Sequence, residues 1–371
     1  YDKRVKQSFT YNHTKIKYFD GTRGYINYQT EYVNLFSGRN ELKWGVSDLN
    51  PMIIGNGSQI FDFVKFDFKY KSFRYTFLHG WLVLPKSTVQ IDSLVGGVYR
   101  KNAKYIAINR IGFNPTERLK IGITQEIIYA NRNVELSYLN PFLLWESAQR
   151  SLNDLDNSFL NFDIRYLLTN GFEMYGSCTF DDLNFNLWGE GKWNTGNNRL
   201  AFQGGFNLAY PLLWKDILFS FDYVQIRPFT FSHPEVGESL SYTNNGSPLG
   251  LNMLPNSIAI SAQFDYFYQP NILLSIRYDN IRHGDNLYDE NGNLVFNYGG
   301  SYLLGTTSIL TTKTPRVLDG NLSTINSINL KINYLTSANL TLSCGIDYHH
   351  ITNNSNNREF FNTSVSIIYN N

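Results

Sequence analysis

Residues 63–71 read FVKFDFKYK, and from Val64 onward apolar and charged side chains alternate. Successive side chains of a β-strand point to opposite faces, so the stretch forms one apolar face and one charged face. The apolar face would hold Val64, Phe66, Phe68 and Tyr70. The charged face would hold Lys65, Asp67, Lys69 and Lys71. A membrane-spanning barrel strand needs this pattern, because one face meets lipid and the other a wet lumen. A soluble sandwich could also produce it, with its polar face in water.

The same period of two recurs along the chain, and sixteen segments fit a strand. They lie at residues 5–18, 25–36, 41–47, 62–71, 73–84, 104–113, 119–131, 159–168, 172–180, 199–210, 217–229, 258–267, 272–281, 324–334, 340–351 and 358–369. No stretch has a helical period long enough to compete, apart from 141–151 inside one connection.

The connections between these segments alternate in length, which separates a barrel from a sandwich. One set is short and rich in Gly, Pro, Asn and Ser, as tight turns require. The other set contains most of the long connections, at 48–61, 85–103, 132–158, 181–198, 230–257 and 282–323, although two of its members, 19–24 and 352–357, are short. Outer-membrane barrels have short periplasmic turns and longer outer loops, whereas a sandwich has no reason to sort loop lengths by end.

The sequence therefore predicts one all-β domain over residues 1–371. It is a transmembrane antiparallel up-and-down β-barrel of about 16 strands, in the range of roughly 16–18. We expect it in the outer membrane of a Gram-negative bacterium, surrounded by outer-membrane lipid, with the long loops at the cell surface.

Composition agrees with a barrel and excludes several function classes. Aromatic residues make up 16% of the chain and charged residues only 17%, which suits pleated strands and the aromatic girdles of barrels. The formal net charge is +1, and no basic stripe suggests nucleic acid. No apolar run is long enough to predict a transmembrane helix. The chain begins without Met or a signal-type segment, so we interpret it as a mature or trimmed product.

No arrangement of side chains predicts catalysis, a cofactor or a metal. The chain has no GxSxG and no Walker-type loop, so we expect no enzyme. Its six histidines form no HExxH motif and no Cys/His cluster. The two cysteines, Cys178 and Cys344, fall on the apolar faces of separate strands, and we expect both to be free thiols.

Four local patterns, in order along the chain, resemble the Wzi-type capsule-assembly barrel family. The first is GR at 38–39, KWG at 43–45, NPMII at 50–54 and FD at 61–62. The second is YLNPF at 138–142, with 154–157 following, and the third is FDDL at 180–183. The fourth is RPFT at 227–230, then His233, Tyr242 and NGSPLG at 245–250. The motif residues are Arg39, Trp44, Gly45, Asn140, Pro141, Asp181 and Arg227. Family members often have WGPG or WGxG where this chain has WGVS at 44–47.

The resemblance implies an outer-membrane barrel of about 18 strands with a periplasmic helical part at the N-terminus. It implies a role in attaching surface polysaccharide, as a lectin and not as an exporter. This chain shows sixteen segments and no helical part. Similar barrels in gliding bacteria are labelled as motility proteins, so one alternative is a structural subunit of a larger surface, secretion or gliding complex with protein partners. A second alternative is a passive diffusion channel.

The long loops supply the side chains that a carbohydrate site uses, namely aromatic faces, amides, carboxylates and Arg. We expect the contacts to extracellular polysaccharide to come from Trp145, Arg150, Asp154, Asp182, Trp188, Tyr242 and Asn245. We also expect the loops at 132–158, 230–257 and 282–323 to fold inward and occlude the lumen. Apolar stretches within them, such as 142–145 and 249–254, need burial, and the barrel mouth is the nearest place.

Overall fold

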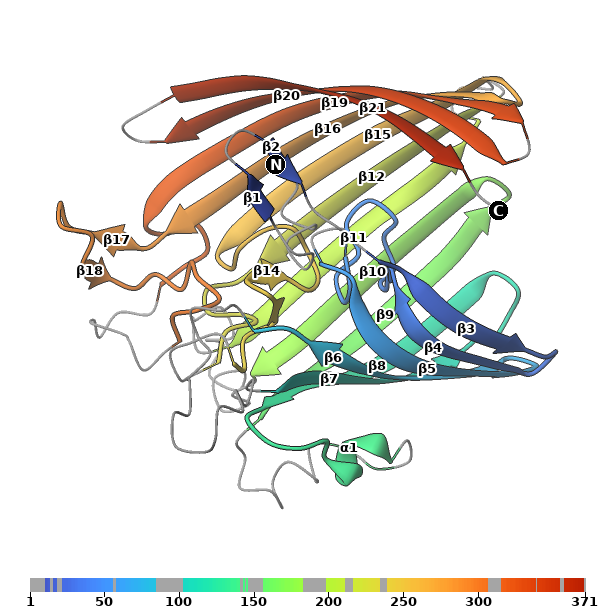
Figure 1. Ribbon diagram of the computed structural model, residues 1–371, viewed down its shortest axis with the longest axis horizontal. Helices are drawn as coiled ribbons and strands as arrows, with labels where there is room; N and C mark the ends of the chain where they lie inside the picture. The colour runs from blue at the N-terminus through green and yellow to red at the C-terminus, as the bar shows by residue number, and fades with distance from the viewer. Residues whose placement is uncertain are drawn as a thin grey trace.

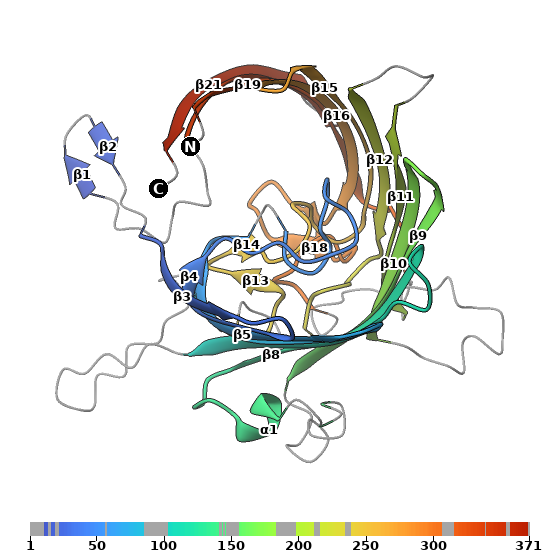
Figure 2. The ribbon, with the colours of Figure 1, turned by 90° about the vertical axis from the view of Figure 1, so that its right-hand side faces the viewer.

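Fifteen strands form a single antiparallel sheet that curves around one lumen, and each strand pairs with its neighbours in chain order (Figures 1 and 2). The computed structural model describes residues 11–13, 16–18, 22–55, 58–84, 103–140, 143, 145, 156–182, 198–210, 216–233, 239–305, 315–337, 339–353 and 357–369. The strands of the sheet are β3 (Gly24–Gln29), β4 (Val33–Asn40), β5 (Phe61–Tyr70), β6 (Phe73–Leu82), β7 (Lys104–Phe113), β8 (Leu119–Ala130), β9 (Asn157–Thr169), β10 (Phe172–Asp182), β11 (Arg199–Ala209), β12 (Ile217–Ile226), β15 (Ser257–Gln269), β16 (Ile272–Asp285), β19 (Asn321–Ser337), β20 (Leu340–Asn353) and β21 (Asn357–Tyr369).

The predicted strands and the sorting of loop lengths are confirmed for most of the chain. The eight strands from β5 to β12 and the five later strands of the sheet each coincide with a predicted segment. Connections at one end of the barrel are short, such as 71–72 between β5 and β6. Connections at the other end are mostly long, and they include the short strands β13 (Thr243–Asn244), β14 (Ser247–Pro248), β17 (Leu287–Tyr288) and β18 (Leu294–Phe296).

The N-terminal predictions need correction. The predicted strand 25–36 is two strands, β3 and β4, because a turn at 30–32 reverses the chain, with the Thr30 N–H donating to the Val33 carbonyl at 2.7 Å. The predicted strand 41–47 is not a strand and belongs to a long connection. Within the predicted strand 5–18, β1 (Tyr11–His13) and β2 (Ile16–Tyr18) pair with each other and not with the sheet. Residues 5–10 of that segment lie outside the described residues.

The two edges of the sheet are β3 and β21, and they are not paired with each other in the part of the chain that the structure describes (Figure 2). Both strands run toward the short-turn end, so they could not form an antiparallel pair. Antiparallel barrels close with an even number of strands. With fifteen strands, the sheet therefore cannot close by antiparallel pairing of its own two edges.

Strand β5 has the two faces that its sequence predicts. On the inner face Lys65 forms an ion pair with Asp67 at 2.8 Å, and its ammonium lies 6.0 Å from the ring centre of Trp44, which comes from a connection inside the lumen. On the outer face Val64 and Tyr70 are 40% and 49% exposed. Lys71 is the exception, because it lies in the turn with a φ of 50° and its ammonium sits over the ring of Tyr70.

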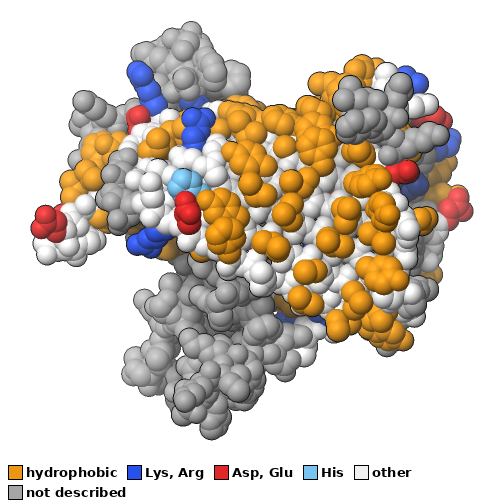
Figure 3. Space-filling model, turned by 90° about the horizontal axis from the view of Figure 1, so that it is seen from above, with side chains coloured by type: hydrophobic (Ala, Val, Ile, Leu, Met, Phe, Trp, Pro, Cys, Tyr) orange, Lys and Arg blue, Asp and Glu red, His pale blue; other side chains and the backbone are white. Residues whose placement is uncertain are grey.

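The outer wall of the barrel is apolar, as contact with lipid requires. Hydrophobic side chains spread over the strands in Figure 3, and the charged groups visible there gather toward the ends. Exposed aromatic residues form a belt close to the short turns: Tyr70, Phe73, Phe113, Tyr166, Tyr266, Tyr268, Tyr334 and Tyr369. Such belts mark the boundary between hydrocarbon and water. Among the described residues, no helix combines the length and apolar character needed to cross a membrane.

Both thiols are free, as the alternation predicts. Cys178 on β10 and Cys344 on β20 belong to strands far apart in the sheet. Cys178 pairs in register with Phe162 and Phe202, and Cys344 with Ile332 and Val365, so both lie on the apolar outer face.

We predict that an arginine at Phe66 destabilises the barrel in a bilayer by about 2–4 kcal/mol, the cost of a cation on the lipid face near the membrane centre. Phe66 lies midway along β5 on the outer face. The measurement is denaturant unfolding in lipid vesicles. The control is Lys65→Arg on the adjacent inner position, which should leave stability unchanged. Equal losses in both variants would contradict the assignment of the two faces.

Candidate functional site

A connection from the long-loop end enters the lumen and crosses it. We call residues 41–55, which follow β4, the inward loop. Its two arms meet where the Trp44 N–H donates to the Ile54 carbonyl at 2.8 Å and the Ile54 N–H donates to the Trp44 carbonyl at 3.0 Å. The segment between these residues lies inside the barrel, as Figure 2 shows from the short-turn end.

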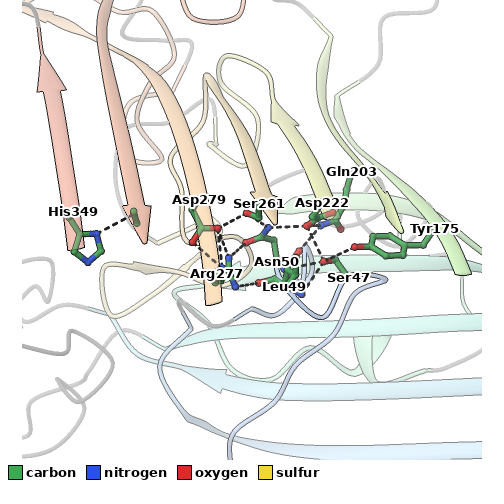
Figure 4. Close-up of polar contacts among 11 residues, drawn as sticks. Ser47, Leu49, Asn50, Tyr175, Gln203, Asp222, Ser261, Arg277, Asp279 and His349 are labelled. Carbon is green, nitrogen blue, oxygen red and sulfur yellow. Dashed lines mark hydrogen bonds and ion pairs between the residues drawn. The ribbon is translucent and has the colours of Figure 1, made fainter. Parts of the chain in front are cut away.

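Asp222 of β12 holds the tip of the inward loop. Its carboxylate accepts hydrogen bonds from the Ser47 hydroxyl, the Asn50 side-chain amide and the Gln203 side-chain amide, each at 2.9 Å (Figure 4). Asp222 is completely buried and Ser47 is 2% exposed, so water cannot substitute for these partners. We call this arrangement the polar latch.

Arg277 of β16 binds the same loop on the side that faces away from Asp222. Its guanidinium donates to the Leu49 carbonyl at 3.1 Å and to the Asn50 side-chain oxygen at 2.9 Å. Asp279, on the same face of β16, forms an ion pair with Arg277 at 2.8 Å and accepts from the Ser261 hydroxyl at 2.5 Å. Strands β11, β12, β15 and β16 therefore all contribute to fixing one loop in the lumen (Figure 4).

Between the polar latch and the long-loop end, an apolar core that we call the plug packs inside the barrel wall. Loop and wall residues contribute to it together: Met52, Ile53, Ile54, Phe61, Phe63, Leu78, Leu82, Ile106, Ile108, Ile128, Phe159, Ala201, Val224, Ile226, Phe231, Tyr242, Leu249, Leu251, Met253, Ala259 and Tyr302. Inward-facing aliphatic residues at this end of the strands provide the wall. The plug therefore occupies the part of the lumen beside strands β5 to β15 at its long-loop end.

Tyr242 of connection 227–256 contacts both the inward loop and the barrel wall. Its hydroxyl lies 2.8 Å from the Ile53 carbonyl and also contacts the Glu126 carboxylate of β8. Its ring packs against Phe159 and Phe231, with ring centres 5.0 and 5.1 Å away. Burial, together with the nearby Glu126, raises the pKa of Tyr242 well above its ordinary value, so the phenol stays neutral.

Two glycines allow the two inward connections to cross. The Gly55 N–H donates to the Leu249 carbonyl at 2.8 Å. A methyl group added at Gly250 would lie 2.0 Å from the Met52 carbonyl oxygen, and one at Gly55 would lie 2.1 Å from the Gly250 carbonyl oxygen. Backbone atoms form both obstacles, so neither can move aside as a flexible side chain would. Only glycine fits at this crossing.

The predicted inward folding is confirmed for two of the three loops. Connection 227–256 supplies much of the plug, and Tyr302 of connection 286–320 joins it, with its hydroxyl donating to the Met253 carbonyl at 2.7 Å. Connection 131–156 behaves differently. It carries the one-turn helix α1 (Leu136–Leu139), which lies outside the barrel wall in Figure 2.

Tyr138 and Trp145 of connection 131–156 are buried against Tyr105 and Tyr129 on the outer face of β7 and β8. The prediction for this loop is wrong because the outer wall, like the lumen, offers an apolar surface for burial.

The structure does not bring the predicted polysaccharide residues together. Trp145 and Tyr242 are each 1% exposed, so neither ring can receive a sugar in this conformation. Asn245 is half-buried and donates to the Gln59 side-chain oxygen at 3.0 Å. Asp182 ends β10 opposite Arg199, and its side chain is not described. The remaining predicted contacts lie outside the described residues: Arg150, Asp154 and Trp188.

The first family motif marks the start of the inward loop. Arg39 pairs with Asp62 across β4 and β5, with its Nε 3.0 Å from the carboxylate. Trp44 forms the bridge that joins the loop arms. A methyl group added at Gly45 would lie 2.7 Å from the Met52 backbone nitrogen, so the glycine permits the loop to fold back on itself.

The later motifs support the plug. Asp181 accepts from the Phe231 N–H at 2.6 Å, which anchors connection 227–256 at its start. The buried Arg227 donates its N–H to the Leu200 carbonyl at 3.0 Å. On the outer face, the Asn140 carbonyl accepts from the Trp145 indole at 3.3 Å, and Pro141 lies outside the described residues. The described motif residues thus act as supports.

Sequence reasoning missed the wall residues that hold the inward loop, among them Gln203, Asp222 and Arg277. Each occupies a lumen-facing position of an alternating strand, which the pattern predicts. What the pattern lacks is the identity of the partner, because Asp222 and Asn50 are separated by 172 positions. No group of three or more His, Cys, Asp or Glu side chains suited to a metal ion occurs in the part of the chain that is described.

Comparison with known proteins gives one family and a set of similar barrels. A family model described as capsule assembly protein Wzi matches residues 4–364. Wzi of Escherichia coli, an outer membrane protein involved in group 1 capsule assembly and a carbohydrate-binding β-barrel, is similar in fold, with a TM-score of 0.59 and 14% identity over 96% of this chain and 71% of that chain.

Two barrels of Pseudomonas aeruginosa are more distant in structure. OprD has a TM-score of 0.44 and 13% identity, covering 95% of this chain and 80% of its own. OccK3 has a TM-score of 0.47 and 12% identity, covering 92% and 77%. No curated protein matches in sequence.

Proposed function

The chain belongs to the family of the capsule assembly protein Wzi, and we propose that it binds surface polysaccharide through its outer loops, without catalysis. Its place is the outer membrane of a Gram-negative bacterium, with the long connections at the cell surface. Outer-membrane lipid and extracellular polysaccharide are its partners in this proposal.

The observation that carries the proposal is the packed core of loops inside the barrel. The plug and the polar latch place buried side chains from the inward loop and connection 227–256 against the wall from β5 to β15. A diffusion channel needs a continuous wet path, and this packed apolar core obstructs a large part of it. What the barrel offers to the outside is a broad face of loops, which suits the holding of a polymer.

Part of the loop face lies within the described residues, and its side chains suit the binding of a sugar. Tyr288 of β17 is 44% exposed beside Asp289, whose carboxylate binds the Asn293 side-chain amide at 2.9 Å. Hydrogen bonds from Asn293 lower the pKa of Asp289, so it stays an ionised acceptor for sugar hydroxyls. An exposed ring beside fixed polar groups is the usual composition of a carbohydrate site. We propose that Tyr288 acts together with Arg150, Asp154 and Trp188.

The test is the amount of polysaccharide that cells retain at their surface. Because many weak sites hold one polymer, removing two ring contacts should lower retention severalfold. The variant is Trp188→Ala with Tyr288→Ala, in cells that produce the barrel at the normal level. Tyr210→Ala is the matched control, since this ring is 59% exposed at the opposite, short-turn end of the barrel.

Two outcomes would contradict the proposal at different levels. If the double variant retains polysaccharide like the wild type, the contacts lie elsewhere on the loops. If cells lacking the whole protein also retain it normally, polysaccharide binding is excluded as the function. A structural role in a larger surface complex would then replace it.

A further inference from the structure

The lumen contains a cavity on the short-turn side of the inward loop, and the proposed function does not use it. Its volume is about 400 Å³, and its walls come from the inner faces of β5 to β9. The inward loop forms its roof through residues 42–46 and Ile53. This size accommodates a small polar ligand such as a phosphorylated monosaccharide.

The lining of this cavity is strongly basic. Six cationic side chains face it: Lys43, Lys65, Arg74, Arg110, Lys120 and Arg165. Three carboxylates compensate part of this charge, because Lys65 pairs with Asp67, Arg110 with Asp163 and Arg165 with Glu173. The net charge is therefore +3. Among the described residues, Lys43, Arg74 and Lys120 have no ion-pair partner.

The register of the strands brings like charges together on the same wall. Lys120 of β8 stands directly opposite Arg165 of β9, and Lys69 of β5 stands directly opposite Arg74 of β6. Like charges in cross-strand pairs are destabilising. Three of these four side chains, Arg74, Lys120 and Arg165, line the cavity, so an anion bound there would reduce the repulsion in both pairs.

The wall is shaped so that a guanidinium can lie along it. Gly122 leaves the space in which Arg110 rests, since a methyl group there would meet the guanidinium nitrogens. Arg110 in turn donates to Asp163 at 2.9 Å. The exposed side chains of Arg74 and Lys120 lie within a few residues of the short turns. The cavity is therefore reached from the short-turn end, which faces the periplasm in barrels of this kind.

We propose that this cavity is a binding site for a phosphate-bearing anion that enters from the periplasm. Three cations without carboxylate partners match the multiple negative oxygens of a phosphate better than the single charge of a sugar carboxylate. Low-dielectric walls strengthen the attraction. The plug lies between this site and the long-loop end, so binding here is distinct from polysaccharide binding by the outer loops.

The experiment is calorimetric titration of the purified full-length barrel in detergent at low salt. The probes are inorganic phosphate, glucose 1-phosphate and glucuronate. The variant Arg74→Gln/Lys120→Gln should weaken phosphate binding by about tenfold or more for each cation removed, the factor expected for a charge-assisted hydrogen bond. The control is Lys331→Gln on the inner face of β19, which removes a cation from the same lumen outside the cavity lining.

The thermal stability of the double variant shows whether the variant still folds. It should equal or exceed that of the wild type, because both like-charge pairs are relieved. Tighter binding of glucose 1-phosphate supports the site and identifies a phosphate ester as its ligand, whereas equal affinities support the site with free phosphate as its source. Absence of phosphate binding by the wild type, equal binding of glucuronate, or an unchanged affinity in a stable double variant would overturn the proposal.

Discussion

Replacing Gly250 with alanine should open the lumen of the barrel to ions. The added methyl group would lie 2.0 Å from the Met52 carbonyl oxygen, where two inward connections cross. Overpacking of a buried site costs about 1–3 kcal/mol, and here a backbone must move to relieve it. The inward loop and connection 227–256 then move apart, and the plug loses the contact between them. We expect a larger stable single-channel conductance in planar bilayers than that of the wild type.

The control for this prediction is Gly24→Ala. No atom lies within 4 Å of a methyl group added there, so this variant should remain closed and fully stable. A Gly250→Ala barrel that stays closed with unchanged stability would show that the crossing of the two connections does not hold the plug together.

Replacing Asp222 with alanine should release the inward loop. One donor hydrogen each of Ser47, Asn50 and Gln203 would lose its acceptor at once, while the two amides keep their bonds to the Ser261 hydroxyl and the Asn50 carbonyl. Each buried donor without a partner costs about 1–3 kcal/mol, so the total loss should reach several kcal/mol. Amide hydrogen exchange over residues 46–50 should rise strongly, because these residues would leave the lumen or become wet. Denaturant unfolding should report the loss of stability.

Asp265→Ala is the matched control for the polar latch. This carboxylate also faces the lumen, where it accepts from Gln263 at 2.8 Å and from the Ser275 hydroxyl. None of its hydrogen bonds within the described residues reaches the inward loop. Exchange over residues 46–50 should therefore stay at the wild-type rate. Equal exchange in the Asp222 and Asp265 variants would contradict the role of the polar latch.

Strand periodicity was enough to predict most of the barrel wall. Lipid on one face and water on the other impose a period of two that local sequence carries by itself, as in residues 63–71. The turn at 30–32 was not predicted, because it reads TEY and lacks the Gly, Pro or Asn that marks a tight turn. Residues 41–47 also alternate, yet their partners are lumen side chains such as Asp222, which no local pattern identifies.

The candidate site was much less predictable than the wall. Composition places rings and polar groups in the long loops but cannot distinguish a ring that meets solvent from one that fills a core. Trp145 and Tyr242 look alike in sequence, and they are buried on opposite sides of the barrel wall. The basic cavity was equally hidden, since its lining comes from five strands and the inward loop. Those charges come together only through the pairing register of the strands.

Direct binding of surface polysaccharide by the purified barrel tests the central claim. The full-length protein in nanodiscs would be immobilised at several densities, and binding of polysaccharide extracted from the same cells would be followed by interferometry. We expect saturable binding that strengthens with surface density and that free polysaccharide competes away. No binding at any density, by a barrel that remains folded and closed, would contradict it.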